Sequence, residues 1–165
     1  MKFTKGYWMN LPGVTNTDAV QVREVKVEND RVYLYTVPYH ADMRAMGGPL
    51  LEMYISSPQP DIIRTEAYHF MGSNQKMPAF ELNDAHCALE VENTETTVTI
   101  KSGNTKLVIG KNPCSFDYYY KDKKLTSIGN RFGNAMISTI STPDGNYMRA
   151  QMNLDSGEKV YGLGE

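Results

Sequence analysis

Short stretches in which polar and apolar residues alternate recur along this chain, and they constrain its fold more than any other feature. Residues 23–27 (REVKV) and 31–37 (RVYLYTV) are a typical pair, separated by Glu28-Asn29-Asp30. Successive residues of a strand face opposite sides of a sheet, so this pattern predicts two half-buried strands joined by a tight turn. No window repeats apolar residues with a 3.6-residue period over three turns, and we therefore expect little helix.

Further segments have the same character and are separated by residues typical of turns, such as Pro58, Pro60 and Gly103-Asn104. Short strands at spacings of about 8–12 residues predict an all-β antiparallel β-sandwich. No repeat or low-complexity linker interrupts the 165 residues, so we expect one domain over residues 1–165. The additional predicted strands are residues 50–56, 62–70, 88–91, 96–102, 106–109, 115–120, 124–127 and 147–154.

Charge and composition exclude several classes of partner. A net charge of −2 argues against binding to nucleic acid, which requires a basic surface. No basic run favours a lipid surface, and no apolar segment approaches the roughly 20 residues that span a membrane. The start of the chain lacks the apolar region of a secretory signal. Cys87 and Cys114 have no metal-ligand spacing, so we expect reduced thiols, no metal, no cofactor and a cytoplasmic location.

The three histidines, His40, His69 and His86, are scattered and do not form an HxH or HExxH motif. His69 lies in an alternating segment, where its side chain either faces solvent or lies in the core with its hydrogen bonds satisfied. Sugar epimerases of the aldose mutarotase type use histidines with a glutamate as acid and base. The spacing of the histidines in this chain does not support that constellation.

The aspartates and glycines also favour structural interpretations. A glycosidase needs one carboxyl group whose pKa is raised by burial and another that stays ionised, and no such pair is recognisable. Gly47-Gly48-Pro49 and Gly162-Leu163-Gly164 lack the strand–loop–helix context of a phosphate loop and are predicted turns. The aspartates expected in solvated turns are Asp18, Asp42, Asp61, Asp84, Asp122 and Asp144.

A run of aromatic residues, SFDYYY, raises the alternative of a platform for sugar stacking. In a strand, Phe116, Tyr118 and Tyr120 share one face, while Asp117 and Tyr119 share the other. We expect one of these faces to pack in the core. The only tryptophan, in the segment GYW near the start, is expected to anchor an N-terminal strand.

Five phrases, taken together and in this order, are similar to the N-terminal domain of family 31 glycoside hydrolases, especially the bacterial α-xylosidases. The sharpest is the segment GEKVYGLGE at residues 157–165, which is normally followed by Arg-Phe in the family. The phrases are MKFTKGYWMNLPGV, GPLLEMYISSPQPDIIRTEAYHF, VENTETTVTIKSGNTKLVI, SFDYYYKDKKLTS and NLDSGEKVYGLGE.

This resemblance implies a galactose-mutarotase-like β-sandwich, or supersandwich, that precedes a catalytic (β/α)₈ barrel. The two aspartates of the retaining reaction then lie in the barrel, beyond Glu165, so we expect no catalytic, cofactor-binding or metal-binding residue in this chain. Val160 and Tyr161 are expected to close the last strand. Gly162 and Gly164 are expected to allow turns as the chain proceeds toward the barrel.

The main hypothesis is an accessory domain that braces the barrel of a larger α-glycosidase acting on α-xylosides or related oligosaccharides. The partner is then the protein's own C-terminal barrel, and its docking surface is an exposed apolar patch that also favours homo-oligomers of the isolated domain. Two alternatives remain open. The sandwich binds carbohydrate by itself through Tyr118–Tyr120, or it is an aldose epimerase-like enzyme with His69 or His86 facing a carboxylate.

Overall fold

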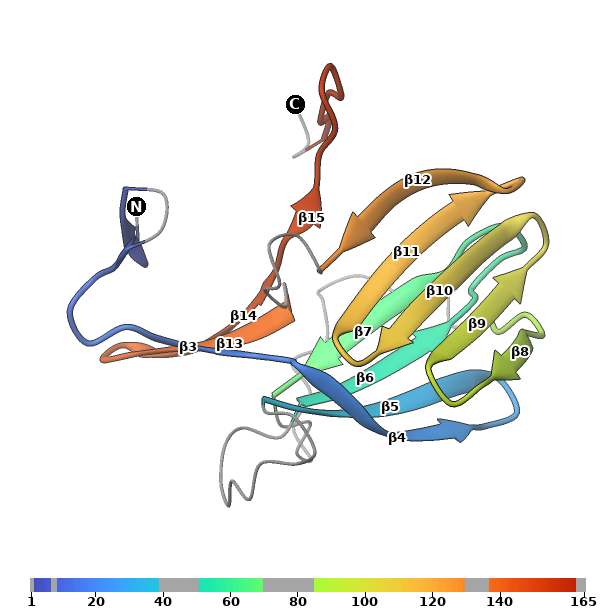
Figure 1. The fold of residues 1–165 in the computed structure, drawn as a ribbon, viewed down its shortest axis with the longest axis horizontal. Helices are drawn as coiled ribbons and strands as arrows, with labels where there is room; N and C mark the ends of the chain where they lie inside the picture. Colours follow the sequence, from blue (N-terminus) through green and yellow to red (C-terminus); the bar gives the residue numbers. More distant parts are fainter. Residues whose placement is uncertain (1, 7–8, 39–50, 70–84, 130–136, 163–165) are drawn as a thin grey trace.

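The computed structural model describes residues 2–6, 9–38, 51–69, 85–129 and 137–162. These residues form antiparallel strands and contain no helix (Figure 1). None of them therefore forms a helix long and apolar enough to cross a bilayer. The prediction of an all-β protein with little helix is confirmed.

Two sheets face each other and form the sandwich (Figure 1). One sheet has four strands in sequence order, and the other has six strands in the order β15-β12-β11-β10-β9-β8. The strands of the first are β4 (Gln21–Val27), β5 (Arg31–Val37), β6 (Leu51–Ser56) and β7 (Arg64–Tyr68). The strands of the second are β8 (Glu90–Asn93), β9 (Thr97–Ser102), β10 (Thr105–Lys111), β11 (Cys114–Tyr120), β12 (Lys123–Ile128) and β15 (Met152–Asn153).

The hydrophobic core lies between these two sheets and follows from the alternation in the sequence. In β5, Val32 and Leu34 are fully buried while their neighbours are half-exposed, and β9 and β10 follow the same period. Because strand residues point alternately to the two faces, one apolar face of each sheet is removed from water. The core is formed mainly by Val32, Leu34, Leu51, Met53, Ile55, Val98, Ile100, Leu107, Ile109 and Phe116.

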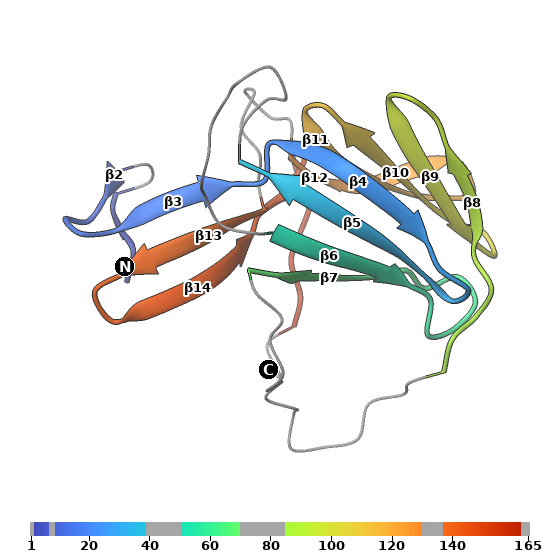
Figure 2. The same cartoon turned by 90° about the horizontal axis from the view of Figure 1, so that it is seen from below.

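A third sheet extends from one end of the sandwich, in the order β14-β13-β3 (Figure 2). Its strands are β3 (Thr15–Asp18), β13 (Ile137–Thr142) and β14 (Gly145–Ala150). Two very short strands near the start, β1 (Thr4–Lys5) and β2 (Met9–Asn10), pair with each other. After β14 the chain enters β15, which pairs with β12 and so connects the third sheet to the sandwich.

The turn after β6 and the β9–β10 hairpin contact each other across the sandwich through what we call the Asp61 clasp, formed by Asp61, Gly103 and Asn104. The Asp61 carboxylate accepts hydrogen bonds from the backbone amide of Asn104 and, at 3.3 Å, from its side-chain Nδ2. Thr105 Oγ1 donates to the Asp61 carbonyl oxygen at 2.6 Å. Asp61 has a φ of 67°, in the left-handed region that Asp tolerates better than most residues.

The predicted strands are mostly confirmed, and the differences have physical causes. The prediction for 31–37 coincides with β5. The predicted strand 147–154 is wrong as one unit, because it is interrupted at Gln151 between β14 and β15. The sequence pattern does not predict β13, because its sequence, ISTIST, does not alternate polar and apolar residues. Residues 137–140 are all buried in the structure, although two of them are polar. β3 escaped prediction because its sequence, TNTD, is entirely polar.

Candidate functional site

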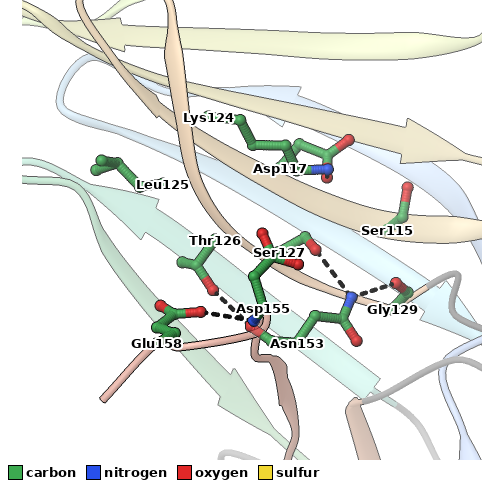
Figure 3. A pocket seen from close by; sticks show the side chains of 10 residues that line it. All are labelled: Ser115, Asp117, Lys124, Leu125, Thr126, Ser127, Gly129, Asn153, Asp155 and Glu158. Atoms are coloured by element: carbon green, nitrogen blue, oxygen red, sulfur yellow. Dashed lines mark hydrogen bonds and ion pairs between the residues drawn. The ribbon is translucent and has the colours of Figure 1, made fainter. Parts of the chain in front are cut away.

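A polar hollow of about 400 Å³ lies on the face of β11 and β12 that points away from the core (Figure 3). It exists because Ser115 and Asp117 alternate with the buried Phe116, so their side chains emerge on the outer face. The chain after β15 supplies the other side of the hollow. Its polar lining includes Asp117, Lys124, Ser127, Asn153, Asp155 and Glu158.

Asn153, which lines this polar hollow, is held by hydrogen bonds. Its Nδ2 donates to Ser127 Oγ at 2.8 Å and to the Gly129 carbonyl oxygen at 3.2 Å (Figure 3). Thr126 Oγ1 donates to the Asn153 carbonyl oxygen at 3.2 Å. The side-chain Oδ1 of Asn153 is buried and accepts no hydrogen bond within the described part of the chain. A buried acceptor of this kind can bind a hydroxyl or amide donor.

Three of the charged side chains that line the polar hollow are engaged, two of them with each other and one with the backbone. Lys124 Nζ lies 2.6 Å from Asp117 Oδ1, and this hydrogen bond raises the pKa of the lysine. Glu158 Oε2 accepts a hydrogen bond from the Asp155 backbone amide at 2.9 Å. Asp117 is thus paired with a cation and Glu158 closes a local turn, so these two carboxylates are not arranged as the acid and base of a glycosidase. Among the described residues, no group of three His, Cys, Asp or Glu side chains could hold a metal.

A second hollow, of about 600 Å³, is mainly apolar and lies between β7 and the strands β12, β14 and β15. We call it the apolar groove. Tyr118 contributes its ring, and its hydroxyl lies 3.0 Å from Thr65 Oγ1. Burial raises the pKa of Tyr118, so the phenol stays protonated. The apolar lining includes Ile63, Ala67, Leu125, Ile137, Met148 and Met152.

The two histidines in the described part of the chain, His69 and His86, do not assemble an acid–base site. His86 is exposed, and its Nδ1 lies 3.6 Å from Asp30 Oδ2 in a surface pair. His69 is half-buried directly after β7, and neither histidine lines the polar hollow or the apolar groove. His40 lies outside the described residues. The epimerase hypothesis, which needs a histidine facing a carboxylate in a concave site, therefore has no support from His69 or His86.

The prediction that Asp18 lies in a solvated turn is wrong. Asp18 ends β3 and is half-buried, and burial raises its pKa despite the positive charge of Arg149. Asp61, Asp122 and Asp144 do lie in turns, as predicted. The predictions for Asp42, Asp84, Gly47-Gly48-Pro49 and the tryptophan concern residues outside those described.

The aromatic run divides between two faces, as its spacing predicts. Phe116 is buried and Tyr118 packs against the core, so this face is not an open stacking platform. Tyr120, at the end of β11, is partly exposed, and Tyr119 lies 5.0 Å below the Lys106 ammonium. Within the described ranges, no aromatic side chain lines the polar hollow. The hypothesis of sugar stacking on Tyr118–Tyr120 therefore loses Tyr118, whose ring packs against the core.

The two cysteines are free thiols, as expected from their spacing. Cys114 is buried at the start of β11, and this burial raises the pKa of its thiol to about 12. Cys87 is half-buried. A thiol that stays protonated at neutral pH is a poor nucleophile, so Cys114 is a core residue.

The last described segment differs from its prediction. The final strand ends at Asn153, and residues 154–162 are exposed outside any strand. Val160 and Tyr161, predicted to close the last strand, are 75% and 83% exposed. Gly162 has a φ of 140°, consistent with the predicted freedom of the backbone there.

Comparison with protein families identifies the fold. Residues 52–165 match the family model of the glycosyl hydrolase 31 N-terminal galactose mutarotase-like domain. The chain belongs to this family. The resemblance seen in the five sequence phrases and the prediction of a galactose-mutarotase-like β-sandwich are thereby confirmed.

Relatives of this glycosyl hydrolase 31 N-terminal domain include two α-xylosidases. The α-xylosidase XylQ of Lactiplantibacillus pentosus is 26% identical over 172 residues, which cover 100% of this chain and 22% of that protein. An α-xylosidase of Emericella nidulans is 27% identical over 186 residues, covering 100% of this chain and 24% of that protein. The chain thus spans about a quarter of the length of these relatives.

Solved structures give the same fold. A cycloalternan-forming enzyme from Listeria monocytogenes, in complex with a pentasaccharide substrate, matches with a TM-score of 0.59 and 17% sequence identity. The match covers 84% of this chain and 12% of that enzyme. At this identity the likeness supports the β-sandwich fold of the glycosyl hydrolase 31 N-terminal domain and nothing further.

Proposed function

We propose that this chain is the N-terminal accessory domain of a larger retaining α-glycosidase of the α-xylosidase type. The observation that carries the proposal is the pattern of coverage. Two α-xylosidases align with the whole chain, yet the chain accounts for only 22% and 24% of their lengths. The remaining length is enough for a separate catalytic domain.

The contribution of the sandwich to the enzyme is architectural. Its two main sheets share a continuous core, and in its polar hollow Asp117 is paired with Lys124 while Glu158 accepts a backbone hydrogen bond. In this proposal the acid, the base and the determinants of sugar specificity belong to a barrel that follows residue 165. The sandwich braces that barrel, and the enzyme works in the cytoplasm on α-xylosides or related oligosaccharides.

Hydrolysis of p-nitrophenyl α-xyloside tests this proposal. The 165-residue chain and the full-length gene product are assayed side by side under the same conditions. We expect turnover by the full-length protein only, because the accessory domain supplies no acid–base pair. Turnover by the 165-residue chain alone, or a full-length protein without activity on α-glycosides, would contradict the proposal.

A second candidate function is carbohydrate binding by the sandwich itself, and the Oδ1 atom of Asn153 favours it. This atom is buried without a hydrogen-bond donor among the described residues, and the hollow that Asn153 lines also carries the hydroxyl side chains of Ser115, Thr126 and Ser127. Calorimetric titration with xylose and xylo-oligosaccharides tests this function. The variant Asn153→Ala is the control and should lose any binding, whereas no heat up to millimolar sugar would remove this candidate.

A further inference from the structure

The apolar groove is continuous with the hydrophobic core. Ile128 and Ile137, which line it, are members of the core cluster, and Ile63, Ala67 and Tyr118 pack against that cluster. Its rim carries large apolar side chains that remain in water, since Leu125 and Met152 are each 52% exposed and Met148 is 38% exposed. A core that opens to solvent through a groove of this size is typical of an interaction surface.

One wall of the apolar groove is also a sheet edge. β7 is the last strand of the four-stranded sheet and has β6 as its only strand neighbour among the described strands. An edge strand presents backbone amides and carbonyls that can pair with another segment. Thr65 and Ala67 of β7 line the groove, so an occupant would meet both apolar side chains and backbone hydrogen-bonding groups.

The opposite wall is formed by the last part of the chain. Met148 and Ala150 of β14 and Met152 of β15 line the groove, and the chain then continues through exposed residues 154–162. Any polypeptide that continues the chain would therefore be connected to this wall through the exposed residues 154–162. A tethered segment reaches such a site at an effective concentration in the millimolar range, far above that of a free partner.

We propose that the apolar groove is occupied, in the full-length enzyme, by the polypeptide that follows residue 165. This inference rests on the proposed function, and it identifies the surface through which the sandwich holds the rest of the enzyme. It accounts for the exposed Leu125, Met148 and Met152, and for the exposed tail that continues from them. The two α-xylosidase relatives have more than three quarters of their length outside the part matched by this chain, which supplies the occupant.

Methionine oxidation by hydrogen peroxide, followed by peptide mass spectrometry, tests this proposal with native reporters. Met152 in the groove is 52% exposed, and Met9, far from it in sequence on β2, is 55% exposed, so the two start from matched exposure. A second control is the variant Val27→Met, at the end of β4, where the native side chain is 56% exposed. The 165-residue chain and the full-length enzyme are treated in parallel.

In the 165-residue chain we expect Met152 to oxidise as fast as the control methionines. In the full-length enzyme we expect Met152 to oxidise at least about tenfold more slowly than in the 165-residue chain, because burial keeps peroxide from the sulfur. The methionine introduced by Val27→Met should oxidise at the same rate in both proteins. Equal rates for Met152 and the Val27→Met control in the full-length enzyme would overturn the proposal. Protection of Met152 in the 165-residue chain that increases with protein concentration would also overturn it, because the occupant would then be a second copy.

A charged substitution gives an independent readout. Met148→Arg should lower the unfolding temperature of the full-length enzyme and leave that of the 165-residue chain nearly unchanged, because only the former buries the new charge. Val27→Arg is the matched control and should change neither unfolding temperature.

Hydrolysis of p-nitrophenyl α-xyloside by the same full-length preparation separates the docking proposal from the proposed function. An active enzyme with freely oxidised Met152 refutes only the docking surface, and an inactive one with protected Met152 refutes only the α-glycosidase function.

Discussion

The geometry of the Asp61 clasp allows the loss of stability caused by a substitution at Gly103 to be predicted. Gly103 has a φ of 57°, and a Cβ atom added there would overlap Asp61 Oδ1 and lie 3.2 Å from the Asp61 backbone nitrogen. The substitution Gly103→Ala must therefore displace the Asp61 carboxylate. That carboxylate is the acceptor for the Asn104 backbone amide, so the hydrogen bonds of the clasp are lost together with the close contact.

Two terms set the expected loss of stability for Gly103→Ala. An L-residue in the left-handed region costs about 1–2 kcal/mol. The lost hydrogen bonds to a charged acceptor add about 1.5 kcal/mol, taken at the low end because this end of the sandwich is partly exposed. The total is about 2.5–3.5 kcal/mol, which corresponds to a fall in the unfolding temperature of roughly 5–14 °C for a protein of this length.

A double-mutant cycle separates the two terms. Asp61→Gly tolerates the φ of 67° at that position and removes the carboxylate. In this background Gly103→Ala should cost only the backbone term, about 1–2 kcal/mol, so the two substitutions should be non-additive by about 1.5 kcal/mol. Urea unfolding of the four proteins measures this coupling. Gly6→Ala is the control, because its φ is 75° and no atom lies within 4 Å of the added Cβ. Additive effects at Asp61 and Gly103 would refute the role assigned to the clasp.

Three further predictions concern the core and its titratable groups. Phe116→Ala should destabilise the fold by about 3–5 kcal/mol in urea unfolding, because its ring is 1% exposed between the sheets. The Cys114 thiol, with a pKa of about 12, should stay unlabelled by a thiol reagent in the native state while Cys87 reacts, and both should react in denaturant. Burial raises the pKa of Asp18 above its ordinary value of 3.8. The contribution of Asp18 to stability is therefore present below pH 3.8 and is lost as the pH rises through the folded-state pKa. Asp18→Asn should accordingly gain stability relative to the native protein between acidic and neutral pH, as measured by urea unfolding.

Local pattern was sufficient to predict most strands but not the contacts that shape the surface. β5 is recognisable because each buried residue is followed by a half-exposed one over most of its length. The Asp61 clasp joins residues 43 positions apart, and nothing in the sequence near Asp61 distinguishes it from another turn aspartate. Asp18 was assigned to a turn because its strand lacks apolar residues, although pairing with β13 half-buries it. The polar hollow depends on the return of the chain through β15 beside β12, which no local pattern encodes.

The apolar groove and the polar hollow share a wall, and this arrangement connects the docking proposal with the question of sugar binding. Leu125 and Thr126 of β12 line both, so a segment seated in the groove would lie beside the hollow and reshape its rim. Any affinity of the hollow for sugar should then differ between the 165-residue chain and the full-length enzyme. Titration of both proteins with xylo-oligosaccharides distinguishes the cases. Equal affinities would mean that the hollow acts alone. Binding by the full-length enzyme that Asn153→Ala weakens would place the hollow at the boundary between the sandwich and the rest of the enzyme.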